Sequence, residues 1–315
     1  MFNSKKSTAD IASSLDNVHT AKPPGTQIQY PFEVKKVSVD NMELVYVDEG
    51  KGDNILLFLH GVGSCIPIWK KNIKALRNNY RCIAVDLPGH GYSDKGDHTY
   101  SIQFYVDVLF KFIKKLDLSS VILVGHSMGG QISVKAGLQD PALIKKIVLI
   151  SPAGLEPYYL FERQMLLNCM ALVVTSGNAF AHNDLNYLIG SDYDKSLAEE
   201  MLSQLAFFKN DSLQFGKMLL RSTRGMLFEP IRSDLQKLSQ ECLVMVGIND
   251  QVCPYNYLRI ETYADMAFNT AKKIPNGKVL QLNGNHFLQY QKADFINNEL
   301  DKFIKQGIFA PSDNV

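Results

Sequence analysis

The feature that most constrains this chain is a short apolar run, residues 121–124, that leads directly into Gly-His-Ser-Met-Gly-Gly at 125–130. Short aliphatic runs rich in β-branched residues are typical of buried strands. Glycines and a helix-like segment, residues 131–139, follow the run, so the pattern predicts a strand, a sharp turn and a helix. Ser127 lies at the apex of the turn, beside the free N–H groups of a helix start. This placement marks Ser127 as a candidate nucleophile.

Strand-like and helix-like segments alternate along most of the chain. The continuous apolar character of most of these strands is what parallel strands buried on both faces require, whereas the first two read as a hairpin turned at Asp40-Asn41. The sequence therefore predicts the α/β class, with a mostly parallel eight-stranded sheet and helices on both faces. The predicted strands are residues 33–39, 42–48, 54–59, 81–85, 121–124, 146–150, 242–246 and 278–282. The predicted helices of this core are residues 66–78, 102–116, 131–139, 255–268 and 293–305.

One connection is much longer than the others, about ninety residues between Ile150 and Cys242. A loop of that length without secondary structure is implausible in a compact domain. Its position after a strand places it over the carboxyl ends of the strands, where open sheets bind ligands, so we predict a helical cap. The helical patterns in it are residues 161–174, 194–208 and 213–226. The predicted division is a polar extension (1–30), a first core part (31–154), the cap (155–228) and a second core part (229–315).

Composition and charge limit the kinds of molecule that this chain is expected to bind. Lys and Arg number 33 against 32 Asp and Glu, a net charge of +1, which gives no electrostatic case for nucleic acid binding. The five cysteines are scattered, and Cys82 and Cys242 fall in predicted strands, so we expect buried reduced thiols and a cytoplasmic protein. The segment 165–174 is too short for a membrane anchor. We expect a small-molecule substrate, no metal, no cofactor, and a monomer or homodimer.

A serine nucleophile needs a base and an acid that orients the base. His286 directly follows the last predicted strand, at the edge of the sheet where Ser127 lies, and is the best candidate for the base. His126 is set aside because strand-to-turn geometry points it away from its neighbour. Asp250, after the preceding strand, is the preferred acid, and Glu156, after the strand at 146–150, is the alternative. The chain order Ser127, Asp250, His286 is the one expected for this architecture.

An oxyanion intermediate needs two backbone N–H groups. Met128, the residue after the candidate nucleophile, offers one of them. The second is expected from the loop after the strand at 54–59, which reads His60-Gly61-Val62-Gly63. Val62 is placed to give its N–H, and the glycines on either side allow the loop to turn toward Ser127. We therefore predict an oxyanion hole formed by Val62 and Met128.

These motifs together resemble the α/β-hydrolase superfamily, of the capped single-domain, esterase-like kind, over roughly residues 32–307. The resemblance rests on the loop at 60–63, the loop at 86–94, the Ser127 motif, Asp250 and His286. Relatives with epoxide hydrolase or dehalogenase activity carry aspartate at the nucleophile position, so Ser127 speaks against both activities. The family commonly has a small residue before the histidine, whereas Asn285 stands here. The resemblance implies that the loop at 86–94 shapes the wall of the site.

The substrate is less constrained than the chemistry. The cap is rich in large apolar side chains, which suggests an apolar acyl or aromatic pocket. Candidate substrate contacts are Trp69, Phe161, Met165 and Phe287, and candidate cations are Arg163, Arg221, Arg224 and Arg232. We favour a carboxylic ester (or thioester) hydrolase acting through an acyl-enzyme. A carbon–carbon bond hydrolase or an acyltransferase with the same triad, and a slow-turnover ligand receptor, stay open as alternatives.

Overall fold

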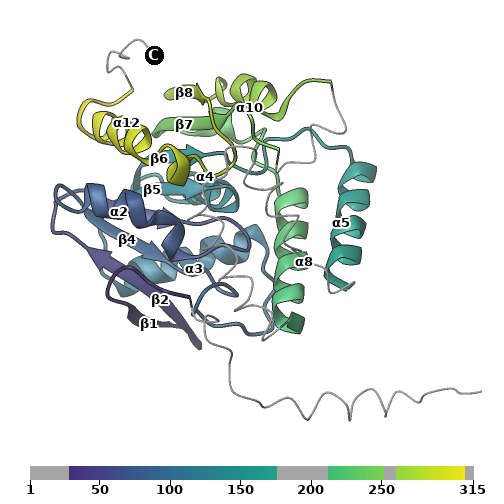
Figure 1. The fold of residues 1–315 in the computed structure, drawn as a ribbon, viewed down its shortest axis with the longest axis horizontal. Helices are drawn as coiled ribbons and strands as arrows, with labels where there is room; N and C mark the ends of the chain where they lie inside the picture. Colours follow the sequence, from purple (N-terminus) through teal and green to yellow (C-terminus); the bar gives the residue numbers. More distant parts are fainter. Residues whose placement is uncertain (1–27, 176–211, 252–259, 309–315) are drawn as a thin grey trace, which may run out of the picture.

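The computed structural model describes residues 28–175, 212–251 and 260–308, which are organised around one eight-stranded sheet (Figure 1). The order of its strands is β1-β2-β4-β3-β5-β6-β7-β8. Pairing is antiparallel between β1, β2 and β4, and parallel from β4 onward. The predicted fold class is confirmed. The strands are β1 Lys35–Val39, β2 Met42–Glu49, β3 Ile55–Leu59, β4 Arg81–Val85, β5 Val121–His126, β6 Ile144–Ile150, β7 Glu241–Gly247 and β8 Gly277–Leu282.

Side chains alternate between the two faces of the sheet, and each face has its own apolar core. In β3, Leu57 and Leu59 join one core, whereas Leu56 and Phe58 join the other. The first core is covered by α3 Ile102–Lys115, α4 Met128–Gln139 and α10 Tyr263–Ala271. The second is covered by α2 Lys70–Leu76, α11 Leu288–Gln291 and α12 Ala293–Gln306, with the 3₁₀ turn η1 Ile66–Trp69 before α2. A second 3₁₀ turn, η2 Leu235–Lys237, precedes β7.

The predicted hairpin at the start of the sheet is present. Val39 pairs with Met42, which leaves Asp40 and Asn41 as the two-residue turn. Asp40 has a φ of 52°, in the left-handed region that short polar side chains tolerate better than most others. The turn chemistry of these two residues therefore explains the register of β1 on β2.

The starts of α4 and α10 differ from the predicted ones. α4 begins at Met128, immediately after Ser127, rather than at residue 131, because the glycines are part of its first turn. The helix expected at 255–268 is represented by α10, which begins at Tyr263 after the N-cap Thr262, whose side chain accepts a hydrogen bond from the Asp265 N–H. Residues 252–259 lie outside the described residues.

The long insertion between β6 and β7 contributes α5 Leu160–Thr175 and α8 Ser212–Phe228, which lie side by side (Figure 1). The helix predicted at 194–208 lies outside the described residues. The two ends of the insertion meet at the Gly154 carbonyl, which accepts hydrogen bonds from the N–H groups of Ile231 (2.9 Å) and Arg232 (3.1 Å). The insertion therefore leaves and re-enters the core at nearly the same point.

α8 is fastened to the core helix α3. The Tyr105 and Ser222 hydroxyls are 2.8 Å apart and both buried, and the Arg221 guanidinium pairs with the carboxylate of Asp97. Glu229, just after α8, accepts hydrogen bonds from two N–H groups in the first turn of α3. α8 is therefore anchored by side chains and not by apolar packing alone.

The described end of the predicted extension packs on the core. Ile28 is buried, and its carbonyl accepts a hydrogen bond from the Tyr92 hydroxyl at 3.1 Å. The Tyr30 hydroxyl donates to Asp86. These contacts attach residues 28–30 to the loop after β4, whereas residues 1–27 lie outside the described residues.

Cys82 in β4 and Cys242 in β7 are buried free thiols, as predicted. Burial raises the pKa of each thiol to about 12, which makes both unreactive at neutral pH. Across the described residues, the helices are all too short or too polar to cross a membrane.

Candidate active site

Ser127 occupies the sharp turn between β5 and α4. Its φ is 52° and its ψ is −119°, a conformation that costs energy for a residue with a β-carbon. The surrounding backbone holds this strain in place. The Ser127 carbonyl accepts hydrogen bonds from Gly130 (2.9 Å), Gln131 (3.2 Å) and Ala153 (3.1 Å), and the Ser127 N–H donates to the Ile150 carbonyl at 3.1 Å.

Three glycines allow the chain to pack this tightly around Ser127. A β-carbon on Gly125 would lie 2.4 Å from the Gly129 carbonyl oxygen, and one on Gly129 would lie 2.1 Å from the Leu59 carbonyl oxygen. A β-carbon on Gly61, in the loop after β3, would lie 3.0 Å from the Ser127 β-carbon. These contacts explain in atomic terms why the turn needs glycine at these positions.

The Ser127 hydroxyl is not used to stabilise α4. Ser127 is the N-cap residue of α4, a position at which serine normally accepts a hydrogen bond from the first turn of the helix. Among the described residues, its side chain makes no such capping bond. The residue is only 8% exposed. The hydroxyl is therefore available for chemistry in a nearly closed site.

The structure brings Asp250 and His286 together. Asp250 follows β7 and His286 follows β8, and these neighbouring parallel strands end at the same edge of the sheet. His286 Nδ1 lies 2.7 Å from Asp250 Oδ2, and the Asp250 side chain is wholly buried. Because a carboxylate oxygen accepts, Nδ1 carries the proton and the lone pair of the neutral ring lies on Nε2. Such an imidazole is prepared to take a proton at Nε2.

Backbone contacts fix the loops that carry this pair. The Ile248 N–H donates to the Leu282 carbonyl at 2.9 Å, and the Asn249 N–H donates to the Gly284 carbonyl at 3.0 Å. The Asn285 side chain accepts a hydrogen bond from the Phe287 N–H at 3.0 Å. Asn285, which departs from the family's small residue, thus closes a local turn around His286.

Glu156, the alternative acid, is used differently. Its carboxylate accepts a hydrogen bond from the Gly154 N–H at 2.9 Å, within its own loop. The carboxylate that His286 Nδ1 contacts is that of Asp250. The geometry therefore favours Asp250 over Glu156 as the partner of His286.

A buried histidine shapes the loop after β3, where the oxyanion donor is expected. His60 Nδ1 donates to the Gly61 carbonyl at 2.8 Å, and Nε2 accepts the Leu87 N–H at 3.0 Å. Burial lowers the pKa of His60 to about 4, so the ring is neutral and both bonds persist at neutral pH. Val62 is partly buried in the apolar core beside this turn. The loop is therefore held by its neighbour, the loop after β4.

Asp86 organises that neighbouring loop. Its carboxylate accepts hydrogen bonds from the Ile66 and Tyr92 N–H groups, both at 2.9 Å, and from the Tyr30 hydroxyl. Burial raises the pKa of Asp86 to about 6, and these donors act against that shift. All of these contacts hold the loop itself in place, and the expectation that it shapes the wall of the site stays a prediction.

A comparison with known proteins completes this picture. A family model described as alpha/beta hydrolase fold matches residues 54–241, more than half of the chain. The chain belongs to the α/β-hydrolase fold family. The sequence resemblance is thereby confirmed for the fold and the family.

Other α/β-hydrolases resemble the chain over most of its length. The hydrolase YugF of Bacillus subtilis (strain 168) is 29% identical over 283 residues, which cover 86% of this chain and 98% of YugF. The enol-lactonase of Burkholderia xenovorans LB400 superposes with a TM-score of 0.73 at 17% identity, covering 86% of this chain and all of the lactonase. A thermophilic esterase of Thermogutta terrifontis gives 0.72 at 18% identity, covering 87% and 99%. At these identities the two structures show the fold alone.

The four predicted substrate contacts fall into two groups in this α/β-hydrolase. Trp69 is buried against Phe58, and its ring meets that of His126 at a centroid distance of 6.5 Å. Phe287 is buried beside the His126 and His286 rings. Phe161 and Met165, by contrast, lie on α5 with exposed fractions of 69% and 42%. Trp69 and Phe287 therefore pack against the ring of His126 beneath the candidate site. Phe161 and Met165 face solvent from α5.

The four candidate cations all have structural contacts. Arg221 pairs with Asp97, as described above. The others contact backbone carbonyls or a ring: Arg163 with Tyr158, Arg232 with Leu155, and Arg224 over the ring of Phe228. Across the described residues, no cluster of histidine, cysteine or acidic side chains could hold a metal ion.

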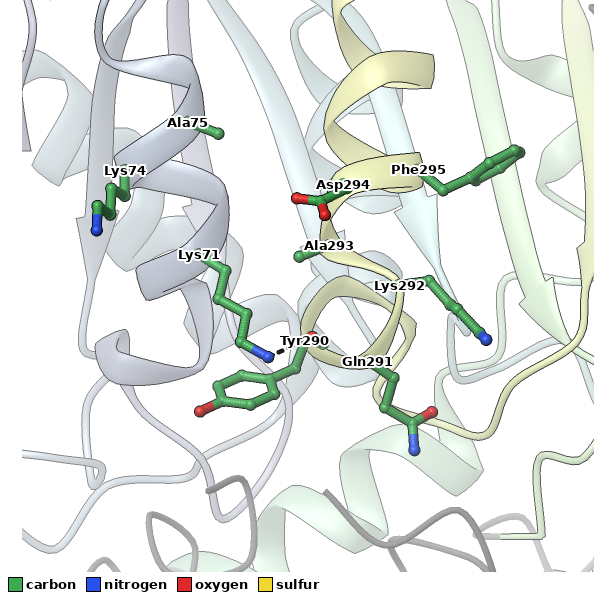
Figure 2. A pocket seen from close by; sticks show the side chains of 9 residues that line it. All are labelled: Lys71, Lys74, Ala75, Tyr290, Gln291, Lys292, Ala293, Asp294 and Phe295. Carbon is green, nitrogen blue, oxygen red and sulfur yellow. Dashed lines mark hydrogen bonds between the residues drawn. The ribbon is translucent and has the colours of Figure 1, made fainter. Parts of the chain in front are cut away.

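An open groove lies apart from these residues, between α2 and the junction of α11 with α12 (Figure 2). It has a volume of about 790 Å³, and Lys71, Lys74 and Lys292 are among the residues that line it. Lys71 Nζ donates to the Tyr290 carbonyl at 3.1 Å and lies 4.0 Å from the centre of the Tyr290 ring. Ser127, Asp250 and His286 do not line this groove. It is therefore separate from the candidate active site.

Sequence reasoning missed the place of His126. The argument that it points away from Ser127 set it aside, yet its ring lies 4.7 Å from that of His286, centroid to centroid. The two histidines are 160 residues apart in the chain. No local pattern connects them, because the contact depends on how β5 and β8 end at the same edge.

Proposed function

We propose that this α/β-hydrolase is a serine hydrolase that cleaves an ester or thioester with an apolar acyl or aromatic group. The observation that carries the proposal is the 2.7 Å bond from His286 Nδ1 to the buried Asp250 carboxylate, at the sheet edge where Ser127 forms the strained turn. A nucleophile, a base and an acid that fixes the base are the components of a serine triad.

In the proposed mechanism, the Ser127 oxygen attacks the carbonyl carbon and His286 Nε2 takes the hydroxyl proton. Asp250 stabilises the imidazolium that forms. The N–H groups of Met128 and Val62 stabilise the oxyanion. When the intermediate collapses, the leaving alcohol or thiol takes the proton from His286, and an acyl-enzyme is left on Ser127. Water then attacks the acyl group by the same route, which releases the acid and restores the serine.

The surroundings of the loop after β3 support an apolar substrate. Val62 packs with the same core as the insertion residues Tyr158, Phe215 and Met218. Small-molecule sites are usually lined mainly by apolar side chains with a few polar groups. The enol-lactonase in the comparison is named for a lactone, which is a cyclic ester. We therefore propose that an apolar acyl chain or ring lies beside Val62 and these insertion residues.

The test combines turnover with covalent labelling. p-Nitrophenyl esters of increasing acyl length are offered to the wild type and to Ser127→Ala, and both are treated with a fluorophosphonate probe. We expect turnover and labelling in the wild type and neither in the variant. Equal labelling of both proteins would contradict the assignment of Ser127. Slow single turnover with a ligand-dependent rise in Tm would favour a receptor, and cleavage of a diketone but of no ester would favour a carbon–carbon bond hydrolase.

A further inference from the structure

His126, the residue that precedes the proposed nucleophile, lies against the proposed base. It is the last residue of β5 and is 1% exposed. Its ring is enclosed by three aromatic rings, those of Trp69, His286 and Phe287, at centroid distances of 6.5, 4.7 and 5.2 Å. The ring is therefore held in one orientation by packing on several sides.

The hydrogen bond of this ring reaches the backbone of the base itself. His126 Nε2 lies 2.9 Å from the His286 carbonyl oxygen. A carbonyl only accepts, so Nε2 carries the proton and donates. Burial and the neighbouring imidazole of His286 keep the pKa of His126 well below its usual value, so the ring is neutral. His126 thus joins the backbone of His286 to the end of β5, directly before Ser127.

The other nitrogen of the ring argues against a purely space-filling role. With the proton on Nε2, Nδ1 is a buried acceptor, and it has no hydrogen-bond partner among the described residues. It faces Gly61, where a β-carbon would lie 3.2 Å away. An unpaired buried acceptor is destabilising. An apolar aromatic ring would fill this space without an unpaired ring acceptor, so the polar ring is explained by its one hydrogen bond, to the His286 carbonyl.

We propose that His126 is a positioning residue for the base: it fixes the His286 backbone from one side while Asp250 fixes the ring from the other. This inference rests on the proposed serine hydrolase function. Two anchors determine where His286 Nε2 stands relative to the Ser127 hydroxyl. With only Asp250 left, the imidazole keeps its tautomer but can move along the direction of proton transfer.

Three substitutions separate the donor from the ring. His126→Phe keeps the ring and removes the donor. His126→Gln places an amide N–H near the position of Nε2, and His126→Asn carries the same amide one bond short of it. We expect the phenylalanine and asparagine variants to lose about 10- to 100-fold in kcat with KM nearly unchanged, the range seen when an outer-shell contact or a small misplacement is involved. We expect the glutamine variant to recover most of that loss.

Stability is measured alongside activity. We expect the Tm of His126→Phe to stay within a few degrees of the wild type, because the loss of the unpaired Nδ1 is offset by a His286 carbonyl that no longer has its donor. If the phenylalanine variant does not fold, the glutamine and asparagine pair carries the comparison alone. Wild-type kcat in the phenylalanine and asparagine variants, or an equal loss in all three, would overturn the positioning role while leaving the proposed function intact. A wild type that neither turns over esters nor labels at Ser127 would overturn both.

Discussion

Gly247 and Asn285 are packed so closely that a β-carbon on Gly247 would lie 2.4 Å from the Asn285 carbonyl oxygen. The same β-carbon would lie 2.5 Å from the Gly284 carbonyl oxygen. Both neighbours are backbone atoms, which cannot rotate away as a side chain can. The missing side chain at Gly247 is therefore what lets the loop that carries His286 approach the loop that carries Asp250.

The first prediction follows from this contact. Gly247→Ala should push the two loops apart, lengthen the His286–Asp250 bond and lower kcat by about 100-fold, the cost of a displacement near 1 Å at a reacting group. Gly277→Ala is the matched control, since a β-carbon there would lie 2.8 Å from that of Ile274, at the opposite end of β8. The control should lower Tm and leave kcat close to wild type. Equal kcat in the two variants would contradict the prediction.

The second prediction separates the two candidate acids. Asp250→Asn should leave the fold intact and lower kcat by about four orders of magnitude, because an amide N–H facing Nδ1 favours the wrong tautomer of His286. Glu156→Gln should change kcat little, since Glu156 accepts its hydrogen bond from Gly154. Ester turnover by the purified variants measures both effects. A mild Asp250→Asn with a crippled Glu156→Gln would transfer the role to Glu156.

The third prediction concerns stability at acid pH. Burial lowers the pKa of His60 to about 4 and those of His90 and His126 well below their usual value. Below about pH 6.5 these histidines bind protons in the unfolded chain but stay neutral in the folded protein. The free energy of unfolding therefore falls as pH falls. Each histidine contributes a slope of up to about 1.4 kcal/mol per pH unit. Asp86 acts in the opposite sense, because its pKa is raised to about 6.

The stabilising effect of that raised pKa is complete below the unfolded value of 3.8 and is lost as pH rises through about 6. Asp86 therefore offsets about one of the three histidines on acidification. Urea unfolding at a series of pH values between about 7 and 5 should show a net fall in stability. His60→Gln should reduce the slope, and a slope that is unchanged in this variant would exclude His60 as a source.

The fourth prediction concerns the aromatic residues near the site. Phe287→Ala should cost about 3–5 kcal/mol of stability and lower kcat, because Phe287 is buried beside the rings of both His126 and His286. Phe161→Ala should leave Tm nearly unchanged and KM within about twofold of wild type, as expected of an exposed side chain. KM for the best long-chain ester is the measurement. A large rise in KM for Phe161→Ala would place α5 on the substrate.

Local patterns were sufficient for most of the sheet. The strand predicted at 81–85 agrees with β4 at both ends, because a continuous apolar run bounded by polar residues leaves little choice. β5 extends beyond the predicted 121–124 because Gly125 and His126 still pair with Leu149 and Ile150 of β6. The short helix α11 was not predicted, since four residues carry no periodicity. Pairing and packing, rather than propensity, decide such boundaries.

In the candidate site, too, local patterns predicted some features and long-range packing determined the others. Its spacing along the chain placed Ser127, Asp250 and His286 at one edge, because parallel strands bring their carboxyl ends together. What could not be predicted were contacts between residues far apart in sequence: His126 with His286, Gly247 with Asn285, and His60 with Leu87. Each depends on the relative height of two loops above the sheet, which no single segment encodes.

The contact between the two ends of the insertion, at the Gly154 carbonyl, has a consequence for engineering this chain. The Gly154 carbonyl accepts hydrogen bonds from the N–H groups of both Ile231 and Arg232. The segment between residues 154 and 231 is therefore a loop whose two ends are in contact. The entropy of closing such a loop grows only slowly with its length. Segments of different length can therefore be exchanged at this junction at little entropic cost, provided that Gly154, its two donors and the contacts of α8 with the core are kept. A change of the insertion at this junction leaves Ser127, Asp250 and His286, the residues of the proposed triad, unaltered.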